Sequence, residues 1–201
     1  VPLRASAAGV RNSGGHIHNG NRPAGTFRPT SGNSNRNGLW TTTYTSPEVG
    51  GFEEITISVA MSVPQRPGRA RITVRVPALG PMPSGANYRL VGQTRTHPDN
   101  HYATSRVRQA LVNIADQFAQ RFRGQPGYQV LEYNDTSLVY GGLFDIWANW
   151  GTPHSEHRVG TEVDFSNADE LPANMRSALW GIIVSNGGRI LDEGNHWHVR
   201  F

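Results

Sequence analysis

A short proline- and glycine-rich segment divides this chain into two parts with different hydrophobic patterns. Residues 77–85 contain three prolines and two glycines, which oppose both helical hydrogen bonding and a continuous strand ladder. Before this segment, short β-rich runs alternate with turn residues, whereas after it apolar residues recur at helical spacing. The 201 residues can form two small domains. We therefore expect one domain over residues 1–79 and a second over residues 80–201, with a linker near residue 80.

The first part has the pattern of an all-β domain. Strands are predicted at 39–45, 53–61 and 70–76, because these runs are rich in β-branched and aromatic residues. The Gly-, Asn- and Ser-rich residues 30–38 predict a turn. A two-sheet sandwich is the natural way to bury such strands.

Part of this region is similar to a known domain type. Residues 25–60, with the sequence NGLWTTTYTSP at 37–47, resemble bacterial immunoglobulin-like domains. The resemblance implies an immunoglobulin-like β-sandwich at the N-terminus.

The second part has the pattern of an α+β domain. A helix is predicted to begin at Thr104 or Ser105 and to end at Gly124, and a second is predicted with Pro172 in its first turn and with 186–188 as its end. Apolar residues at spacings of three and four mark both helices: Val107, Leu111, Ile114, Phe118 and Phe122 in the first, and Met175, Leu179, Ile182 and Ile183 in the second. Strands expected at 127–133, 160–165, 188–192 and 195–201 would form a small antiparallel sheet.

Two segments about thirty residues apart in the second part predict a metal site. His157 and Asp164 lie in the first segment, and His198 lies in the second. A catalytic zinc typically takes three protein ligands and leaves a fourth position to water. The chain has no cysteine, so its metal ligands must come from His, Asp and Glu.

Strand periodicity allows these ligands to meet. Alternation by two places Asp164 on one face of its strand, and it places His196 and His198 together on one face of the last strand. His157 would reach in from the preceding loop, and Gly160 supplies the backbone freedom for the turn between loop and strand.

The motifs also carry a family resemblance. Residues 134–138 and 141–145, the pattern Ser-x-His-Arg-x-Gly-x-x-x-Asp at 155–164, and His-Trp-His-Val-Arg at 196–200 resemble the penicillin-insensitive murein endopeptidases. These belong to a wider group with the lysostaphin-type peptidases, the D-alanyl-D-alanine peptidases and the Hedgehog signalling domain. The resemblance implies that His157, Asp164 and His198 bind zinc, and that a peptide bond of peptidoglycan is hydrolysed.

A zinc hydrolase also needs a base beside the metal. Zinc lowers the pKa of its bound water towards ~7, and the base moves a proton to the leaving amine. We assign Glu193 and His196 jointly as catalytic residues. His196 shares its face with His198, whereas Glu193 needs a turn or bulge at Gly194 to reach the same face.

Further residues are candidates for binding substrate. His154 either lines the groove or is a surface histidine, and Trp150 either walls the cleft or packs in the core. Arg158, or Arg95, would stabilise an oxyanion or bind a substrate carboxylate.

The remaining histidines allow two interpretations. His16 and His18, two residues apart, would share one face of a strand and could form a second metal site, but we favour two surface histidines in a loop. His97 and His101 are interpreted as part of a turn leading into the first helix, with substrate binding as the alternative.

Charge and composition indicate partners and location. Residues 1–77 carry a net charge of +6 and residues 78–201 a net charge of −2, so the first part could bind an anionic envelope polymer. Interleaved aromatics and a recognition helix are missing, which disfavours nucleic acid. No apolar run approaches the ~20 residues of a membrane span. A start at Val1 is typical of a processed protein, so we expect a secreted or periplasmic bacterial envelope protein.

These observations predict a zinc-dependent peptidase that cleaves peptide cross-links of bacterial peptidoglycan. The alternative is a catalytically weak, metal-containing module that binds a surface or the wall. A peptidase acting on proteins rather than on wall peptides is a third hypothesis.

Overall fold

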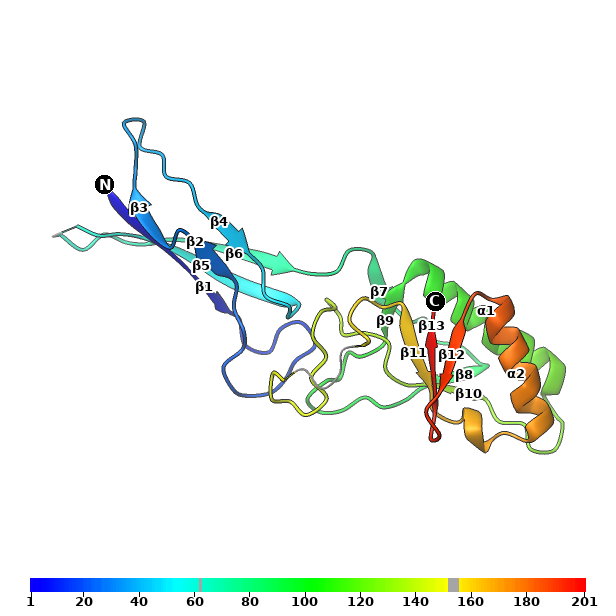
Figure 1. Ribbon diagram of the computed structural model, residues 1–201. Coiled ribbons are helices and arrows are strands. Elements are labelled where there is room, and N and C mark those ends of the chain that lie inside the picture. The colour runs from blue at the N-terminus through cyan, green and yellow to red at the C-terminus, as the bar shows by residue number, and fades with distance from the viewer. Residues whose placement is uncertain (62, 152–155) are drawn as a thin grey trace.

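The computed structural model describes residues 1–61, 63–151 and 156–201. The molecule is elongated, with the strands of the first part at one end and both helices at the other (Figure 1). Loops of the two parts meet between these ends. None of the helices in the described ranges is long and apolar enough to cross a membrane.

The first part contains a four-stranded antiparallel sheet and a separate two-stranded ribbon. The sheet has the order β3-β1-β5-β6, and the ribbon pairs β2 with β4. The strand bounds are β1 (Pro2–Gly9), β2 (Thr26–Arg28), β3 (Ser31–Asn33), β4 (Thr43–Thr45), β5 (Gly51–Val59) and β6 (Gly68–Val74). Sequence reasoning missed β1, because its Ala, Ser and Gly residues have weak strand propensity.

The immunoglobulin-like sandwich is not confirmed. Two stacked sheets would bury alternate residues from both inner faces. Among the described residues of 1–79, the buried apolar side chains are only Ala5, Phe27 and Val49, and β6 is mostly exposed. The β-rich character of this part is confirmed, but the described residues provide little of the interior that a sandwich requires.

The expected linker contains a strand. β7 (Leu79–Pro81) pairs antiparallel with β9 (Tyr102–Thr104). Pro81 pairs with Tyr102, whose N–H donates to the carbonyl of Ser137 and not across the ribbon. The missing N–H of Pro81 is tolerated because no ladder bond needs it at this pair. The proline-rich composition was therefore misleading for residues 79–81.

Contacts also cross the expected domain boundary. The N–H of Val76 donates to the carbonyl of Tyr140 at 2.9 Å, and the N–H of Leu143 donates to the carbonyl of Glu48 at 2.8 Å. Val49 forms an isolated bridge with Gly142. The two-domain division stays a prediction, and these contacts join loops from both sides of it.

The second part is built on a five-stranded sheet of order β12-β13-β11-β10-β8. Its strands are β8 (Tyr88–Leu90), β10 (Leu131–Tyr133), β11 (Glu162–Phe165), β12 (Arg189–Asp192) and β13 (Trp197–Arg200). Neighbouring strands are antiparallel, except that β8 and β10 are parallel. The strands expected near residues 131, 162, 189 and 197 are present, and β8 was not anticipated.

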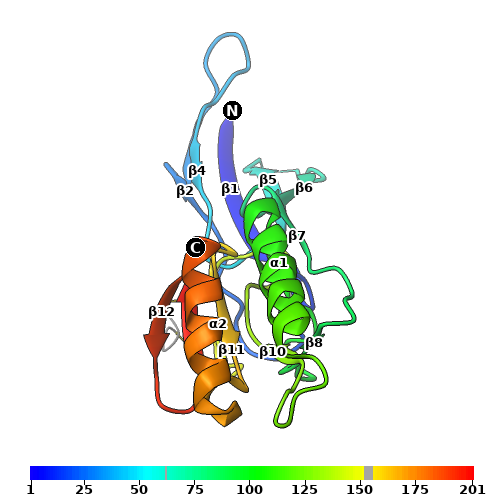
Figure 2. The same cartoon turned by 90° about the vertical axis from the view of Figure 1, so that its right-hand side faces the viewer.

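Both expected helices are present and lie side by side (Figure 2). α1 (Ser105–Phe122) begins after Thr104, whose Oγ1 accepts the N–H of Val107 at 3.4 Å. This is a normal N-cap. α2 (Ala173–Ser185) begins directly after Pro172, and a short 3-10 turn, η1 (Ala168–Glu170), precedes it.

The hydrophobic core lies between these helices and one face of the sheet. The alternate residues Val163 and Phe165 of β11 and Trp197 and Val199 of β13 belong to this core. The helices contribute Val107, Leu111, Ile114, Phe118, Met175, Leu179 and Ile183, among others. Since side chains alternate across a strand, the residues between them in β11 and β13 face away from the helices. That opposite face carries the candidate site.

Candidate metal centre

Asp164 and His198 lie directly opposite one another on adjacent antiparallel strands. Asp164 of β11 pairs with His198 of β13, and Asp164 Oδ1 lies 2.9 Å from His198 Nδ1. Both side chains are buried. The register that places Val163 and Val199 in the core therefore also brings these two polar groups together.

His157 reaches the same carboxylate from the loop before β11. Its Nε2 lies 3.4 Å from Asp164 Oδ1. The backbone of His157 has a φ of 59°, and its N–H donates to Glu162 Oε2 at 2.5 Å, which holds this turn in place. Gly160 has a φ of 69°, and a Cβ there would lie 2.8 Å from the Cα of Ala103. Glycine is needed at this position because the loop passes so close to β9.

These three residues lie close enough together to hold one metal ion. One ligand atom from each of His157, Asp164 and His198 lies within 4.8 Å of the others. Two imidazole nitrogens and a carboxylate oxygen, all buried, are a donor set that suits zinc. The structure therefore brings together the three residues that the sequence motif selects.

The electrostatics of the cluster favour positive charge beside Asp164. Burial raises the pKa of Asp164, but the imidazoles of His157 and His198 lower it by more, so its pKa lies well below the ordinary value. Burial lowers the pKa of His198, but the Asp164 carboxylate raises it by more, with a net upward shift. The Asp164 carboxylate therefore stays ionised, and its charge favours a metal ion or a protonated imidazole beside it.

His196 and Glu193 lie at the solvent edge of this cluster. The turn between β12 and β13 is closed by the Glu193 N–H, which donates to the His196 carbonyl at 3.1 Å. His196 Nε2 lies 3.3 Å from Glu193 Oε2 and 3.6 Å from Asp164 Oδ1. The two side chains are 23% and 41% exposed. The turn at Gly194, with φ 84°, brings Glu193 to the face of His196.

Sequence reasoning did not select two further carboxylates beside His198. Glu156 Oε2 lies 2.6 Å from His198 Nε2, and Glu156, Glu162 and His198 form a second possible ligand set. Arg200 contacts Glu156. Strand alternation puts Glu162 on the same face of β11 as Asp164, but Glu156 lies in an irregular loop whose course no periodicity predicts.

The predicted substrate-binding residues have different surroundings. His154 lies outside the described residues. Arg158 Nη1 donates to Glu48 Oε2 at 2.9 Å, which ties this loop to the first part of the chain. Arg95 is exposed in the loop before β9. Trp150 packs on two other histidines, with ring centroids 4.8 Å from His16 and 4.3 Å from His18.

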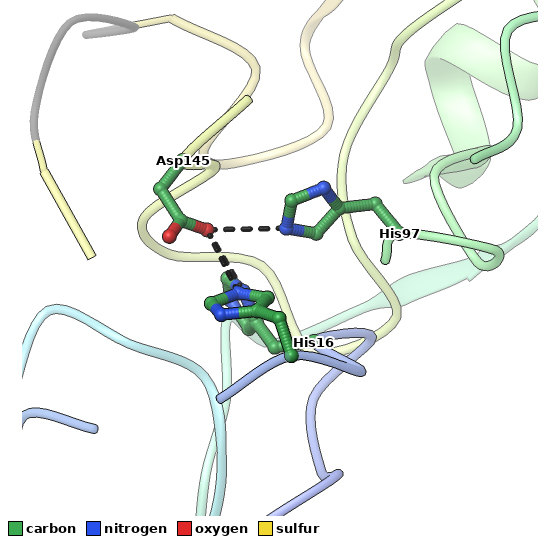
Figure 3. A group of neighbouring side chains, drawn as sticks. His16, His97 and Asp145 are labelled. Carbon is green, nitrogen blue, oxygen red and sulfur yellow. Dashed lines mark hydrogen bonds and ion pairs between the residues drawn. The ribbon is translucent and has the colours of Figure 1, made fainter. Parts of the chain in front are cut away.

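His16 and His18 are not surface histidines, so that preferred interpretation was wrong. They lie with His97 around Asp145, and one ligand atom from each of the four residues lies within 4.8 Å of the others. Figure 3 shows His16 and His97 directed at the same oxygen of Asp145. His16, His97 and Asp145 are buried. Only the tertiary structure could reveal this second cluster, because its members are separated by up to 129 positions in the sequence.

His101 has a structural environment. It is buried, and its Nε2 lies 3.1 Å from the carbonyl oxygen of Tyr133. Its Nδ1 lies 3.3 Å from the side-chain nitrogen of Gln93. His101 therefore connects the loop before β9 to β10, and it does not belong to either cluster.

Comparison of the chain with protein-family models, curated proteins and solved structures finds no match. The function must therefore be inferred from the chemistry of the described residues.

Proposed function

We propose that this protein is a zinc-dependent peptidase that hydrolyses peptide cross-links of bacterial peptidoglycan. One observation carries the proposal: His157, Asp164 and His198 converge, beside the partly exposed pair His196 and Glu193. A buried three-residue donor set next to an acid–base pair is the arrangement that hydrolytic zinc requires.

His157, Asp164 and His198 would hold the metal. Their nitrogen and oxygen donors are buried, on β11, on β13 and on the loop before β11. When bound there, zinc would supply Lewis-acid chemistry, which polarises a scissile carbonyl and makes water a better nucleophile near neutral pH. The helices behind the sheet fix the ligand positions, since Val163 and Val199, the neighbours of two ligands, are fully buried.

His196 would act as the general base, with Glu193 as its partner. His196 Nε2 can take a proton from the attacking water and return it to the leaving amine. The Glu193 carboxylate, 3.3 Å away, would stabilise the protonated imidazole. A positioned base typically contributes about 10²–10⁴-fold to the rate.

The substrate class follows from the motif resemblance and from the charge distribution. The Ser-x-His pattern with the His-Trp-His segment is similar to that of murein endopeptidases, which supports a wall peptide as substrate. The basic first part, in this proposal an immunoglobulin-like attachment domain, would hold an anionic envelope polymer. A secreted or periplasmic location accords with this substrate.

The test is hydrolysis of purified peptidoglycan by the full chain. We expect soluble muropeptides from the zinc-loaded protein, loss of activity with a chelator, and recovery when zinc is added. His196→Ala should lower the rate at least about 100-fold while zinc stays bound. Gln120→Ala, an exposed polar residue of α1 away from this centre, is the control.

Two outcomes would contradict the proposal. Hydrolysis that survives both chelation and His196→Ala would exclude this centre. Tight binding to peptidoglycan without any cleavage by the zinc-loaded protein would instead favour the catalytically weak binding module.

A further inference from the structure

We propose that His16, His18, His97 and Asp145 form a second metal site, closed and structural, which takes a divalent ion of the zinc class and fastens the first part of the chain to the second. The site shares no residue with the cluster around Asp164. It therefore does not depend on the proposed peptidase activity.

The distances among the four ligand atoms match a tetrahedral ion. Asp145 Oδ1 lies 3.0 Å from His16 Nδ1, 3.1 Å from His97 Nε2 and 3.4 Å from His18 Nε2. His16 Nδ1 lies 3.2 Å from His18 Nε2. Ligands at the usual zinc distance of ~2.0–2.1 Å in a tetrahedron are about 3.3 Å apart. Four of the six separations lie between 3.0 and 3.4 Å, close to this value.

Hydrogen bonds alone account poorly for this arrangement. If all three facing nitrogens carried protons, three donors would compete for one carboxylate oxygen, and the N–H groups of His16 and His18 would oppose each other. If one of these nitrogens lacked its proton, its lone pair would face the lone pairs of the carboxylate. A cation at the common point lets all three neutral imidazoles direct their lone pairs inward.

Surrounding groups hold the ligands in a metal-binding orientation. His18 Nδ1 lies 3.2 Å from the Asn19 carbonyl, and donation to this acceptor leaves the Nε2 lone pair free for a metal. The backbone N–H of Trp150 donates to Asp145 Oδ2 at 2.5 Å, so the other carboxylate oxygen remains available to an ion. Such outer contacts are typical of metal centres in proteins.

The site is closed, which favours a structural role. Asp145 is 0% and His16 is 1% exposed, and the Trp150 ring lies against both His16 and His18. Four protein ligands complete a tetrahedral zinc shell and leave no position for water, as in structural zinc sites. Hydrolysis is not expected at this cluster.

The ligands come from three loops without regular structure. His16 and His18 lie between β1 and β2, His97 lies between β8 and β9, and Asp145 lies between β10 and β11. An ion held by all three would close long stretches of chain, which in a chain-entropy view stabilises the folded state. Because such a site does not exist in the unfolded chain, its binding free energy contributes to folding.

The experiment is a zinc titration of the metal-free full-length chain, with elemental analysis after desalting. We expect two zinc ions per wild-type chain. The test variant is His18→Gln, because His18 is the least buried of the four ligands. It should retain one ion per chain. Its zinc affinity at the second site should fall by more than the loss of about 10–100-fold that removal of an outer contact typically causes. His157→Gln, in the other cluster, should also retain one ion, and the double variant should retain none.

Thermal unfolding and cobalt spectra provide a second measurement. Zinc should raise the unfolding midpoint of the His157→Gln variant, and adding His18→Gln to that variant should remove the rise. Cobalt(II) bound to His157→Gln should give the intense visible absorption of a tetrahedral site. The second site is unchanged in this variant, so this measurement does not depend on a substitution there being tolerated.

The outcomes separate this proposal from the peptidase proposal. One ion in the wild type, lost in His157→Gln and kept in His18→Gln, would overturn the second site and leave the first intact. One ion with the opposite pattern would support the second site and contradict the first. A cobalt complex of His157→Gln without a tetrahedral spectrum would overturn the closed geometry.

Discussion

Gly160→Ala tests how the structure positions His157 relative to Asp164. Gly160 lies between these two residues and has a φ of 69°. An added Cβ would lie 2.4 Å from Leu79 Cδ2, 2.8 Å from the Ala103 Cα and 3.1 Å from the Tyr102 carbonyl oxygen. The side chain of Leu79 can move, but the backbone of β9 cannot do so without breaking its pairing with β7.

Two terms contribute to the expected loss of stability. The left-handed conformation costs a residue with a Cβ about 1–2 kcal/mol, and overpacking against fixed atoms costs about 1–3 kcal/mol more. Gly124→Ala is the matched control: its φ is 82°, and a Cβ there meets nothing within 4 Å. The control should show the conformational term alone, and Gly160→Ala should exceed it by the overpacking term.

The measurement is urea-induced unfolding of the metal-free variants, followed by zinc titration. If the loop shifts to relieve the clash, zinc affinity at the Asp164 cluster should fall in Gly160→Ala and stay unchanged in Gly124→Ala. Equal destabilisation of both variants, with equal zinc affinity, would refute the view that the close approach of Gly160 to β9 positions His157.

Two further predictions concern the core and the pH dependence of stability. Leu111→Ala should reduce the free energy of unfolding by about 2–5 kcal/mol, because Leu111 is fully buried, whereas Leu39→Ala, at a residue 65% exposed, should change it by less than about 0.5 kcal/mol in chemical denaturation. Burial lowers the pKa of His101 below 6.5, so the folded state resists a proton that the unfolded state accepts. The contribution of His101 to stability should therefore fall as pH drops below 6.5, by up to about 1.4 kcal/mol per pH unit, and His101→Gln should remove this contribution. An unchanged pH profile in that variant would show that His101 does not contribute to it.

Local signals predicted much of the second part. The spacing of apolar residues predicted α1, and Thr104 was expected at its start because a side-chain oxygen can cap the first turn. The strands that became β11 and β13 were predicted from period-two alternation, with Asp164 and His198 on their polar faces. These predictions succeed because alternation within an element depends on neighbouring residues alone.

The first part was predicted less well. Strand-like composition was visible at 70–76, but the arrangement of sheets depends on long-range pairing, and β1 forms mainly through its ladder with β5. Residues 79–81 looked like a linker because local composition cannot show that β9 will supply a partner for them.

The amino-acid sequence by itself predicted the polar faces of two strands and the two helices, because each depends on short-range spacing. Its motifs also named His157, Asp164 and His198 as candidate metal ligands. Tertiary structure alone decided which loops meet. It brought Glu156 to His198, and it gathered His16, His18 and His97 around Asp145. The three loops that supply these four residues are far apart along the chain, so no local sequence pattern links them. Irregular loops have no period, so their meeting points are fixed by packing of the whole chain.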